Sequence, residues 1–419
     1  MRCSQNSLSR QTIMRIHRLA LKNFKCFKEV DVSFSKITLL TGENSSGKSS
    51  LIYGILAPLQ SISLNGNSFP LYLSLNGNYV NMGGFEEVAF NHSLKNDLGI
   101  DLNFAFGGRT YEFKTSWCFD LIRNSPRLSY LKNRSPFIKT VVSQKEDLSY
   151  VVNIEHIDSE LKSLDIHDFN AQSIDNFNRN IYDYFIEIFD NLYNELINDF
   201  NFISSFRLQP DRTYYQSLLN RTVDKSGRGY IDQILEWNDN QSEESLNLAS
   251  ILKDLKILYD IKPHRLSGGR FEIKVKVKSR SKWESLADVG FGISQFLPII
   301  VADLQLRDNS TLIMSQPEIH LHPSVQANLG DYLVRQVKER NKNYIVETHS
   351  EYLLNRMRLL IVKGEISPED VAVYYFENSV KDGSIAHRIE FTKDGQILNA
   401  PKGFFETYMI DTMDIALNA

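Results

Sequence analysis

Residues 41–50 read Thr41-Gly42-Glu43-Asn44-Ser45-Ser46-Gly47-Lys48-Ser49-Ser50 and fit the pattern G-x-x-x-x-G-K-[ST] without a mismatch. Gly42 and Gly47 allow the backbone to curl so that successive N–H groups face phosphate oxygens. Lys48 adds positive charge for the terminal phosphates, and the Ser49 hydroxyl is a ligand for Mg²⁺. This phosphate loop (residues 42–50) therefore predicts a site for a nucleoside triphosphate.

The sequence on both sides of the phosphate loop supports this prediction. Lys36-Ile37-Thr38-Leu39-Leu40 has the composition of a buried strand, and residues 50–56 have the spacing of a helix. Such a helix directs its N-terminus at the phosphates. The predicted nucleotide-binding residues are Gly42, Asn44, Ser45, Ser46, Gly47, Lys48, Ser49 and Ser50, with Ser49 also the metal ligand.

Composition limits the remaining classes of protein. The chain has 419 residues, is 42% hydrophobic, and carries a formal net charge of -4, so its length suits two or three domains and its charge does not indicate a nucleic-acid binder. Its three cysteines, Cys3, Cys26 and Cys118, are far apart, which argues against a disulfide framework and for a reducing compartment. The polar N-terminus lacks the apolar core of a signal peptide, and no apolar run is long enough to span a membrane. We therefore expect a cytoplasmic protein.

Hydrophobic periodicity divides the chain into three parts. Residues 16–24, 30–34, 98–106 and 110–119 have strand-like patterns, the last two joined by a turn at Gly107-Gly108. Apolar residues within 176–200 recur at helical spacing. We expect the N-terminal part of one nucleotide domain at 14–144, a mainly helical insertion at 145–265, and the C-terminal part of that domain at 266–419.

Residues 271–282 alternate as a strand that places Lys274, Lys276, Lys278 and Arg280 on one face. One interpretation is a solvated edge strand protected by lysines. The other is a contact with a nucleic-acid backbone.

Two apolar strands are expected in the last part of the chain. Leu312-Ile313-Met314 precedes Ser315-Gln316-Pro317-Glu318-Ile319-His320-Leu321-His322-Pro323, and residues 343–346 precede Glu347-Thr348-His349-Ser350. A histidine at such a strand end can contact the γ-phosphate, and we assign this role to His349. On a strand, His320 and His322 would face one side, but no Cys or carboxylate cluster joins them to complete a metal site.

A second anion-binding turn is predicted upstream, at Val289-Gly290-Phe291-Gly292-Ile293-Ser294-Gln295. Glycines and a serine before the apolar helix expected at 296–306 would bind phosphate at its N-terminus. We call residues 290–295 the signature turn, with Gly290, Gly292, Ser294 and Gln295 as its nucleotide-binding residues. Because one nucleotide does not need two such helix ends, we expect two chains to face each other and close each phosphate loop with the partner's turn.

This order of phosphate loop, signature turn, strand and histidine resembles the ABC-type ATPases of the SMC/RecF/OLD branch. The resemblance implies an α/β fold with a mixed sheet, an ATP and Mg²⁺ site, and dimers that enclose ATP between two chains. Leu266-Ser267-Gly268-Gly269 spells the transporter signature, but no helix is expected to begin there.

Several phrases resemble the compact prokaryotic ATPases of anti-phage systems. They are Leu21-Lys22-Asn23-Phe24-Lys25-Cys26-Phe27, residues 202–215, residues 316–323, residues 347–350 and Pro401-Lys402-Gly403-Phe404-Phe405. Among these families the chain is most similar to the ATPase subunit of the Septu system, which works with a separate HNH nuclease. The resemblance implies a homo-oligomeric subunit that regulates or scaffolds such a nuclease. The alternatives are a RecF-like DNA-binding repair ATPase, which the lysine pattern would suit, and an OLD-type nuclease-associated ATPase.

The chain departs from its family at the strand that should end in Asp-Glu. Those positions hold Ser315 and Gln316, and the nearest acid is Glu318, beyond a proline. In such ATPases the carboxylates hold Mg²⁺ and orient the attacking water. We therefore expect ATP to bind and to be hydrolysed slowly or not at all. The candidate catalytic residues are Gln316, Glu318 and His349.

Overall fold

The computed structural model describes residues 15–65, 71–106, 109–134, 138–156, 162–166, 199–215, 222–379, 381–401 and 404. The predicted turn at Gly107-Gly108 and almost all of the predicted helical stretch 176–200 lie outside the described residues, as do Lys402, Gly403 and Phe405.

One large mixed sheet contains 15 strands in the order β10-β15-β16-β3-β17-β18-β2-β1-β4-β5-β6-β7-β8-β9, with β19 paired to β18. Its strands are β1 (Arg15–Phe24), β2 (Phe27–Ser33), β3 (Ile37–Gly42), β4 (Leu98–Phe106), β5 (Arg109–Asp120), β6 (Ser125–Arg134), β7 (Ile138–Gln144), β8 (Tyr150–His156), β9 (Lys162–Ile166), β10 (Phe200–Ile203), β15 (Thr311–Ser315), β16 (Asn343–Glu347), β17 (Val371–Ser379), β18 (Gly383–Phe391) and β19 (Ile397–Leu398). The described part of the chain thus has the predicted α/β fold with a mixed sheet.

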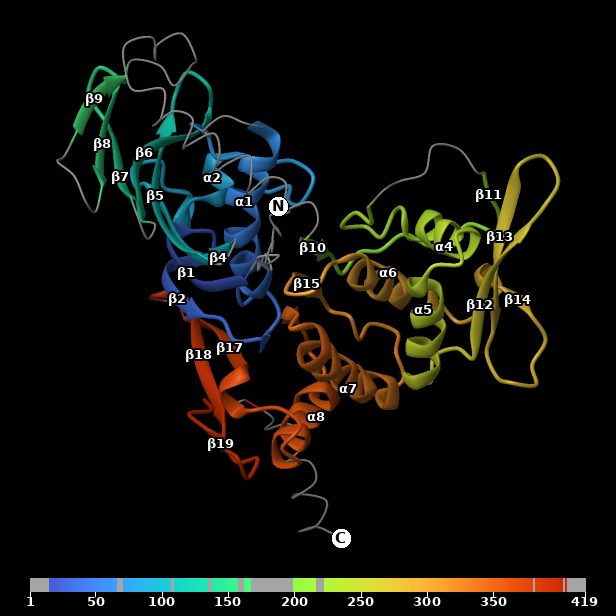
Figure 1. The fold of residues 1–419 in the computed structure, drawn as a ribbon. Coiled ribbons are helices and arrows are strands. Elements are labelled where there is room, and N and C mark those ends of the chain that lie inside the picture. Colours follow the sequence, from blue (N-terminus) through green and yellow to red (C-terminus); the bar gives the residue numbers. More distant parts are fainter. Residues whose placement is uncertain are drawn as a thin grey trace, which may run out of the picture.

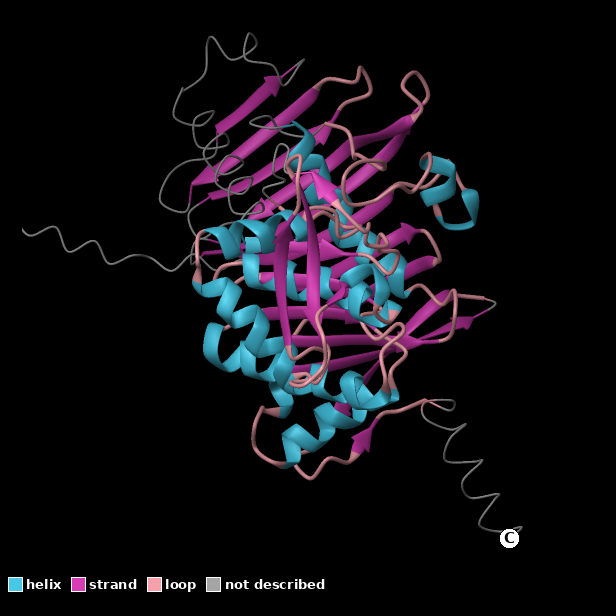
Figure 2. Cartoon of the chain, turned by 90° about the vertical axis from the view of Figure 1, so that its right-hand side faces the viewer, coloured by secondary structure: helices cyan, strands magenta, loops and turns pink. Residues whose placement is uncertain are grey.

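The helices cover the strands that lead to the candidate site. They are α1 (Lys48–Asn65), α2 (Phe85–Val88), α4 (Tyr230–Asp239), α5 (Glu243–Asp254), α6 (Phe291–Gln305), α7 (Pro323–Arg340) and α8 (Glu351–Val362). Short 3₁₀ turns occur at Phe90–His92, Leu286–Asp288 and Pro368–Asp370. Helices α4–α8 lie in front of the strands of the large sheet when the molecule is viewed from their side (Figure 2).

Strands β10, β15, β16, β3 and β17 are mutually parallel. Every residue of β15 and β16 is buried, as expected for parallel strands covered on both faces. Helix α1 lies on one side of these strands, and α6 and α7 lie on the other (Figure 1). Alternate residues enter two hydrophobic cores: Ile313 packs with residues of α1, whereas Leu312 and Met314 pack with residues of α6 and α7. Because these strands run in one direction, their carboxyl ends meet at one edge of the sheet.

A second, smaller sheet contains β11 (Tyr214–Tyr215), β12 (Asp260–Arg265), β13 (Arg270–Lys276) and β14 (Glu284–Ser285). The prediction of one strand over 271–282 is wrong at its end, because Lys278 and Arg280 lie in the turn beyond Lys276. The edge-strand interpretation is also wrong, because β13 pairs with β12 on one side and with β11 and β14 on the other. The predicted row of four cations on one strand face therefore does not form, and Lys274 is paired with Glu272 at 3.0 Å.

The region predicted as a mainly helical insertion, 145–265, contains both kinds of element where it is described. Strands β8 and β9 extend the large sheet, β10 forms its opposite edge, and α4 and α5 pack against α6 and β12. Leu266-Ser267-Gly268-Gly269 forms the hairpin turn between β12 and β13, where both glycines have positive φ and no helix begins. The boundaries of the three parts remain predictions. None of the described helices is both long and apolar enough to cross a membrane.

Candidate nucleotide-binding site

The phosphate loop joins β3, which ends at Gly42, to α1, which begins at Lys48. Gly42 has φ +130, and a Cβ there would lie 2.2 Å from the backbone oxygen of Phe376. Gly47 has φ +103, and its Cβ would lie 2.7 Å from the Cys26 sulfur. Both positions therefore require glycine for steric as well as conformational reasons.

Lys48 is only 4% exposed. Its Nζ donates to the backbone oxygens of Gly42, at 3.1 Å, and Glu43, at 2.5 Å. Burial lowers the pKa of Lys48, and the charges of Glu347 and Glu43 raise it in part. The lysine thus lies folded over the loop, with its charge beside the surface where a phosphate would bind.

Ser49 contacts a residue from a different strand. Its hydroxyl donates to the Glu347 carboxylate with an Oγ–Oε1 distance of 2.8 Å, although 298 residues separate the two in the chain. Glu347 ends β16, the direct neighbour of β3, and is 5% exposed. Glu347 follows an expected strand in the sequence, but no role could be predicted for it, because only the strand order shows that it reaches Ser49.

The end of β15 adopts an unusual backbone. Gln316 has φ +47, in the left-handed region, and its N–H donates to the Glu347 backbone oxygen at 2.7 Å. The buried guanidinium of Arg207 donates to the backbone oxygens of Ser315 and Gln316 at 3.2 and 3.0 Å. Burial lowers the pKa of Arg207 to about 10. Arg207 therefore positions the end of β15. It lies within residues 202–215, where no local pattern marks it for this role.

Glu318 and His349 meet directly. The Glu318 Oε1 accepts the backbone N–H of His349 at 2.7 Å. Burial raises the pKa of the Glu318 carboxyl, although this hydrogen bond from the His349 N–H acts to lower it. Burial and the charge of Lys48 lower the pKa of His349, whereas Glu347 opposes this shift.

These groups surround a cavity of about 830 Å³. The predicted residues that line it are Asn44, Ser45, Ser46, Gly47, Lys48, Ser49, Ser50, Gln316 and His349. Glu347 also lines it, as do residues that sequence reasoning missed: Lys25, Cys26, Glu87, Ala89, Phe90, Asn91, His92, Asn378, Ser379, Gly383 and Ser384. No local pattern marks these residues, because they come from strand ends, turns and a short helix that only the fold brings together. Gly42 and Glu318 are not lining residues.

The signature turn lies apart from this cavity. Gly290 precedes α6, and Gly290 and Phe291 are exposed. Ser294 and Gln295 are buried, and their side chains donate to the backbone oxygens of Phe291 and Leu208 at 2.9 and 3.3 Å. The glycine end of the turn is therefore exposed. The Ser294 and Gln295 side chains stabilise the turn through these hydrogen bonds.

His320 and His322 do not lie on a strand. His320 has φ +64 in the turn after β15, and its ring packs against Phe291 with a centroid distance of 4.8 Å. His322 precedes α7, and its Nδ1 accepts the Ser324 N–H at 3.3 Å. Within the described ranges no three His, Cys, Asp or Glu side chains gather into a metal-binding cluster.

Comparison with known proteins establishes the family. The model of the AAA ATPase domain family matches residues 14–354, so the chain belongs to that family. A second model, described as a protein of unknown function, DUF3696, matches residues 366–415. No curated protein matches the chain.

The chain also matches solved structures of SMC heads. The SMC head bound to the C-terminal winged-helix domain of ScpA has 14% identity and a TM-score of 0.46, covering 90% of this chain and 98% of that one. The Pyrococcus furiosus Smc head with an extended coiled coil, bound to the C-terminal domain of ScpA, has 11% identity and a TM-score of 0.42, covering 96% and 100%. The Thermotoga maritima SMC head domain has 12% identity and a TM-score of 0.37, covering 89% and 98%.

Proposed function

We propose that the chain binds ATP with Mg²⁺ in the cavity at the end of β3 and acts as a nucleotide-gated head. One observation carries the proposal: Lys48, Ser49, Gln316, Glu347 and His349 come from three separate strand ends and line a single cavity. A lysine, a glycine-rich loop and a helix N-terminus at one point are suited to polyphosphate.

The residues present fit a magnesium ion. Ser49 Oγ and Glu347 Oε1 are hard oxygen ligands held 2.8 Å apart at the cavity surface. Bound Mg²⁺ would neutralise charge on the β- and γ-phosphates. Lys48 would bind the terminal phosphates, and His349 would contact the γ-phosphate.

Hydrolysis is proposed to be slow. Gln316 lines the cavity where related ATPases place a water-orienting carboxylate, and its neutral amide cannot accept a proton from water. Glu318, the nearest acid along the chain, directs one oxygen to the His349 N–H and is not a lining residue. ATP would then act mainly as a ligand that selects one conformation or assembly.

Closure is proposed to need a second copy of the chain. The signature turn has an exposed glycine end but does not line the cavity of its own chain. Two chains facing each other would place each turn over the partner's phosphates. A homodimer or higher homo-oligomer with ATP enclosed between chains is the assembly proposed.

The biological setting proposed is a prokaryotic anti-phage complex in which this chain regulates or scaffolds a separate HNH nuclease. Support comes from the sequence resemblance to the Septu ATPase subunit. Co-purification from the native operon would test the setting: a co-eluting HNH protein is expected, and recovery of the chain alone, or with recombination proteins, would contradict it.

The nucleotide proposal is tested by calorimetric titration of the purified chain with ATP and Mg²⁺. Binding is expected for the wild type, and Lys48→Ala is expected to weaken it at least about tenfold, the scale of a charged hydrogen bond. Sizing with and without ATP should show ATP-dependent assembly that Gly290→Trp prevents, because the exposed Gly290 has open space around it. Absence of wild-type binding would refute the proposal, and rapid steady-state turnover abolished by Lys48→Ala would refute slow hydrolysis.

A further inference from the structure

The structure places an acid, Glu347, at the phosphate loop, and no local sequence pattern assigns it a role there. Related ATPases hold Mg²⁺ between the loop Ser or Thr and an acid at the end of the next strand but one, the position of Ser315 here. Ser315 is 6% exposed and carries no charge. Yet Ser49 still has a carboxylate partner, Glu347.

We propose that Glu347, at the end of β16, is the carboxylate that holds Mg²⁺ together with Ser49, in place of the acid missing at Ser315. This inference rests on the proposed nucleotide site and assigns its metal ligand.

The sheet register explains how the acid can change strands. Ser315 and Glu347 are direct partners across the parallel pair β15–β16. Neighbouring strands lie about 4.8 Å apart, so moving the acid from one partner to the other keeps it at the same edge of the sheet. Because β16 lies between β15 and β3, Glu347 is one strand closer to the phosphate loop than residue 315. A Glu on the nearer strand therefore reaches Ser49 directly.

Glu43, in the loop itself, is exposed and outside the cavity lining. Two further acids near the loop are engaged elsewhere. Glu87, the other acid that lines the cavity in the described part of the chain, accepts the Gly84 N–H at 2.8 Å in its own turn. Glu318 accepts the N–H of His349. Glu347 alone among these acids has an oxygen on the Ser49 hydroxyl, the group that the family uses as a metal ligand.

The local charges agree with this geometry. Glu347 acts to raise the pKa of Lys48 and of His349, each of which burial lowers. Burial and the Glu347 charge together raise the pKa of the Tyr53 phenol. Glu347, Lys48 and His349 line the same cavity, so the Glu347 carboxylate lies beside the surface that a metal–triphosphate complex would occupy.

The test compares the affinity for ATP in Mg²⁺ with that in EDTA, using a fluorescent ATP analogue, so that no turnover is needed. In Glu347→Gln the gain in affinity from Mg²⁺ is expected to fall at least about tenfold, the scale of a lost charged contact. Affinity in EDTA should be unchanged or higher, because a negative charge beside the phosphates is removed. Glu351→Gln, an acid on α8 outside the cavity lining, should leave both values unchanged.

A rescue variant sharpens the assignment. Ser315→Asp combined with Glu347→Gln moves the acid to position 315, which pairs with residue 347 across the two strands. This double variant should recover most of the gain in ATP affinity that Mg²⁺ gives the wild type. Electron paramagnetic resonance with Mn²⁺ and ATP should show bound metal in the wild type and the double variant but not in Glu347→Gln.

The outcomes separate this inference from the proposed function. If the wild type binds no ATP at all, the proposed function fails. If the wild type gains affinity from Mg²⁺ and folded Glu347→Gln keeps that gain, the assignment of Glu347 is overturned while the nucleotide site stands. If Glu347→Gln does not fold, Glu347→Asp can be tested instead, because it keeps the carboxylate on a side chain that is one methylene shorter. A reduced gain then supports the assignment, and an unchanged gain overturns it.

Discussion

At each end of β16 a lysine lies near an acid, one of the two coming from a helix, and the two ends differ in what surrounds these charges. Lys342 precedes the strand and pairs with Asp303 of α6 at 3.1 Å. At the other end, Glu347 lies beside Lys48 and the phosphate loop. The side chains of Lys342 and Asp303 are 1% and 0% exposed, whereas Lys48 and Glu347 line a cavity of about 830 Å³.

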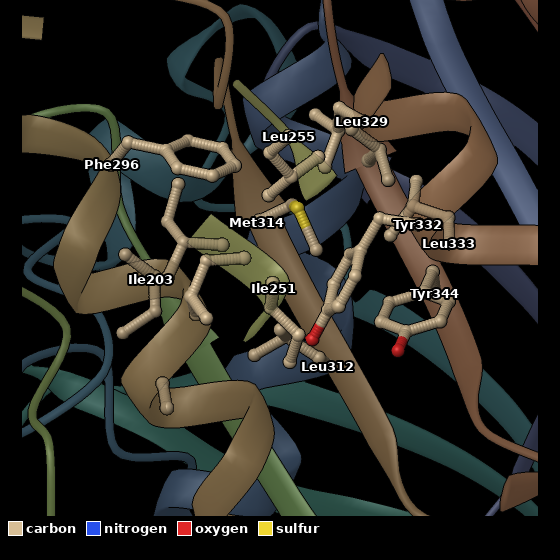
Figure 3. Packing of buried hydrophobic residues seen from close by; sticks show 14 of the residues in the cluster. Ile203, Ile251, Leu255, Phe296, Leu312, Met314, Leu329, Tyr332, Leu333 and Tyr344 are labelled. Carbon is tan, nitrogen blue, oxygen red and sulfur yellow. The ribbon is translucent and has the colours of Figure 1, made fainter. Parts of the chain in front are cut away.

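The closed end satisfies its own charges. Tyr332 and Tyr344 lie side by side in the core, and both hydroxyls donate to the Asp303 carboxylate (Figure 3). Lys342 also donates to the Asp303 backbone oxygen. The open end has fewer protein partners for its charges and space for a ligand. A buried lysine near an acid therefore indicates a role in stability where the two are enclosed, and a role in binding where a cavity adjoins them.

The largest expected effect is at the closed end. Lys342→Ala would leave Asp303 buried without a cation and should lower the free energy of unfolding by about 3–5 kcal/mol. Lys338→Ala is the matched control, because its pair with Glu365 is half-exposed and should contribute no more than about 1 kcal/mol. Urea unfolding measures both. Equal losses for the two variants would break the distinction between a closed and an exposed pair.

An intermediate effect is expected at Glu318, which is buried behind the open end. Because burial raises its pKa, the folded state binds a proton more tightly than the unfolded state does. Wild-type stability should then fall as pH rises from the ordinary glutamate pKa of about 4.3 to the raised value. Glu318→Gln lacks this decline and should gain on the order of 1 kcal/mol relative to the wild type, the scale of one buried hydrogen bond.

Thermal or urea unfolding across that pH window measures the difference for Glu318→Gln. Glu351→Gln, at an acid of α8 that is only partly buried, is the matched control. If the two stability curves of wild type and Glu318→Gln stay parallel, the Glu318 carboxyl does not titrate differently in the folded and unfolded states.

The smallest effect on stability is expected for Lys48→Ala, although it should cause the largest loss of ATP binding. Removing this lysine leaves Glu347 with its Ser49 hydrogen bond and with access to the cavity, so water can solvate the remaining charge. The free energy of unfolding should change by less than about 1 kcal/mol. A loss as large as that of Lys342→Ala would show that Lys48 is part of the folding core and would remove the contrast between the two ends.

Local features of the chain could be predicted because neighbouring residues produce them. The strand before Gly42, the loop through Gly47 and the helix from Lys48 follow from glycine conformation and apolar spacing alone. Strand β4 has the bounds 98–106 that its pattern predicts. Strand β13 shows the limit of such reasoning. Alternation marked it as a strand but could not show that it lies between partners, or that the chain turns after Lys276.

The sequence by itself determined that this chain has a phosphate loop between a buried strand and a helix, because that unit depends on contacts within about a dozen residues. It also determined that the end of β15 lacks an acid. Only the tertiary structure decided which acid contacts Ser49, because the answer depends on β16 pairing between β15 and β3. The physical reason is that sheet pairing brings together Ser49 and Glu347, which are 298 residues apart in the chain, and no local pattern records which strands become neighbours.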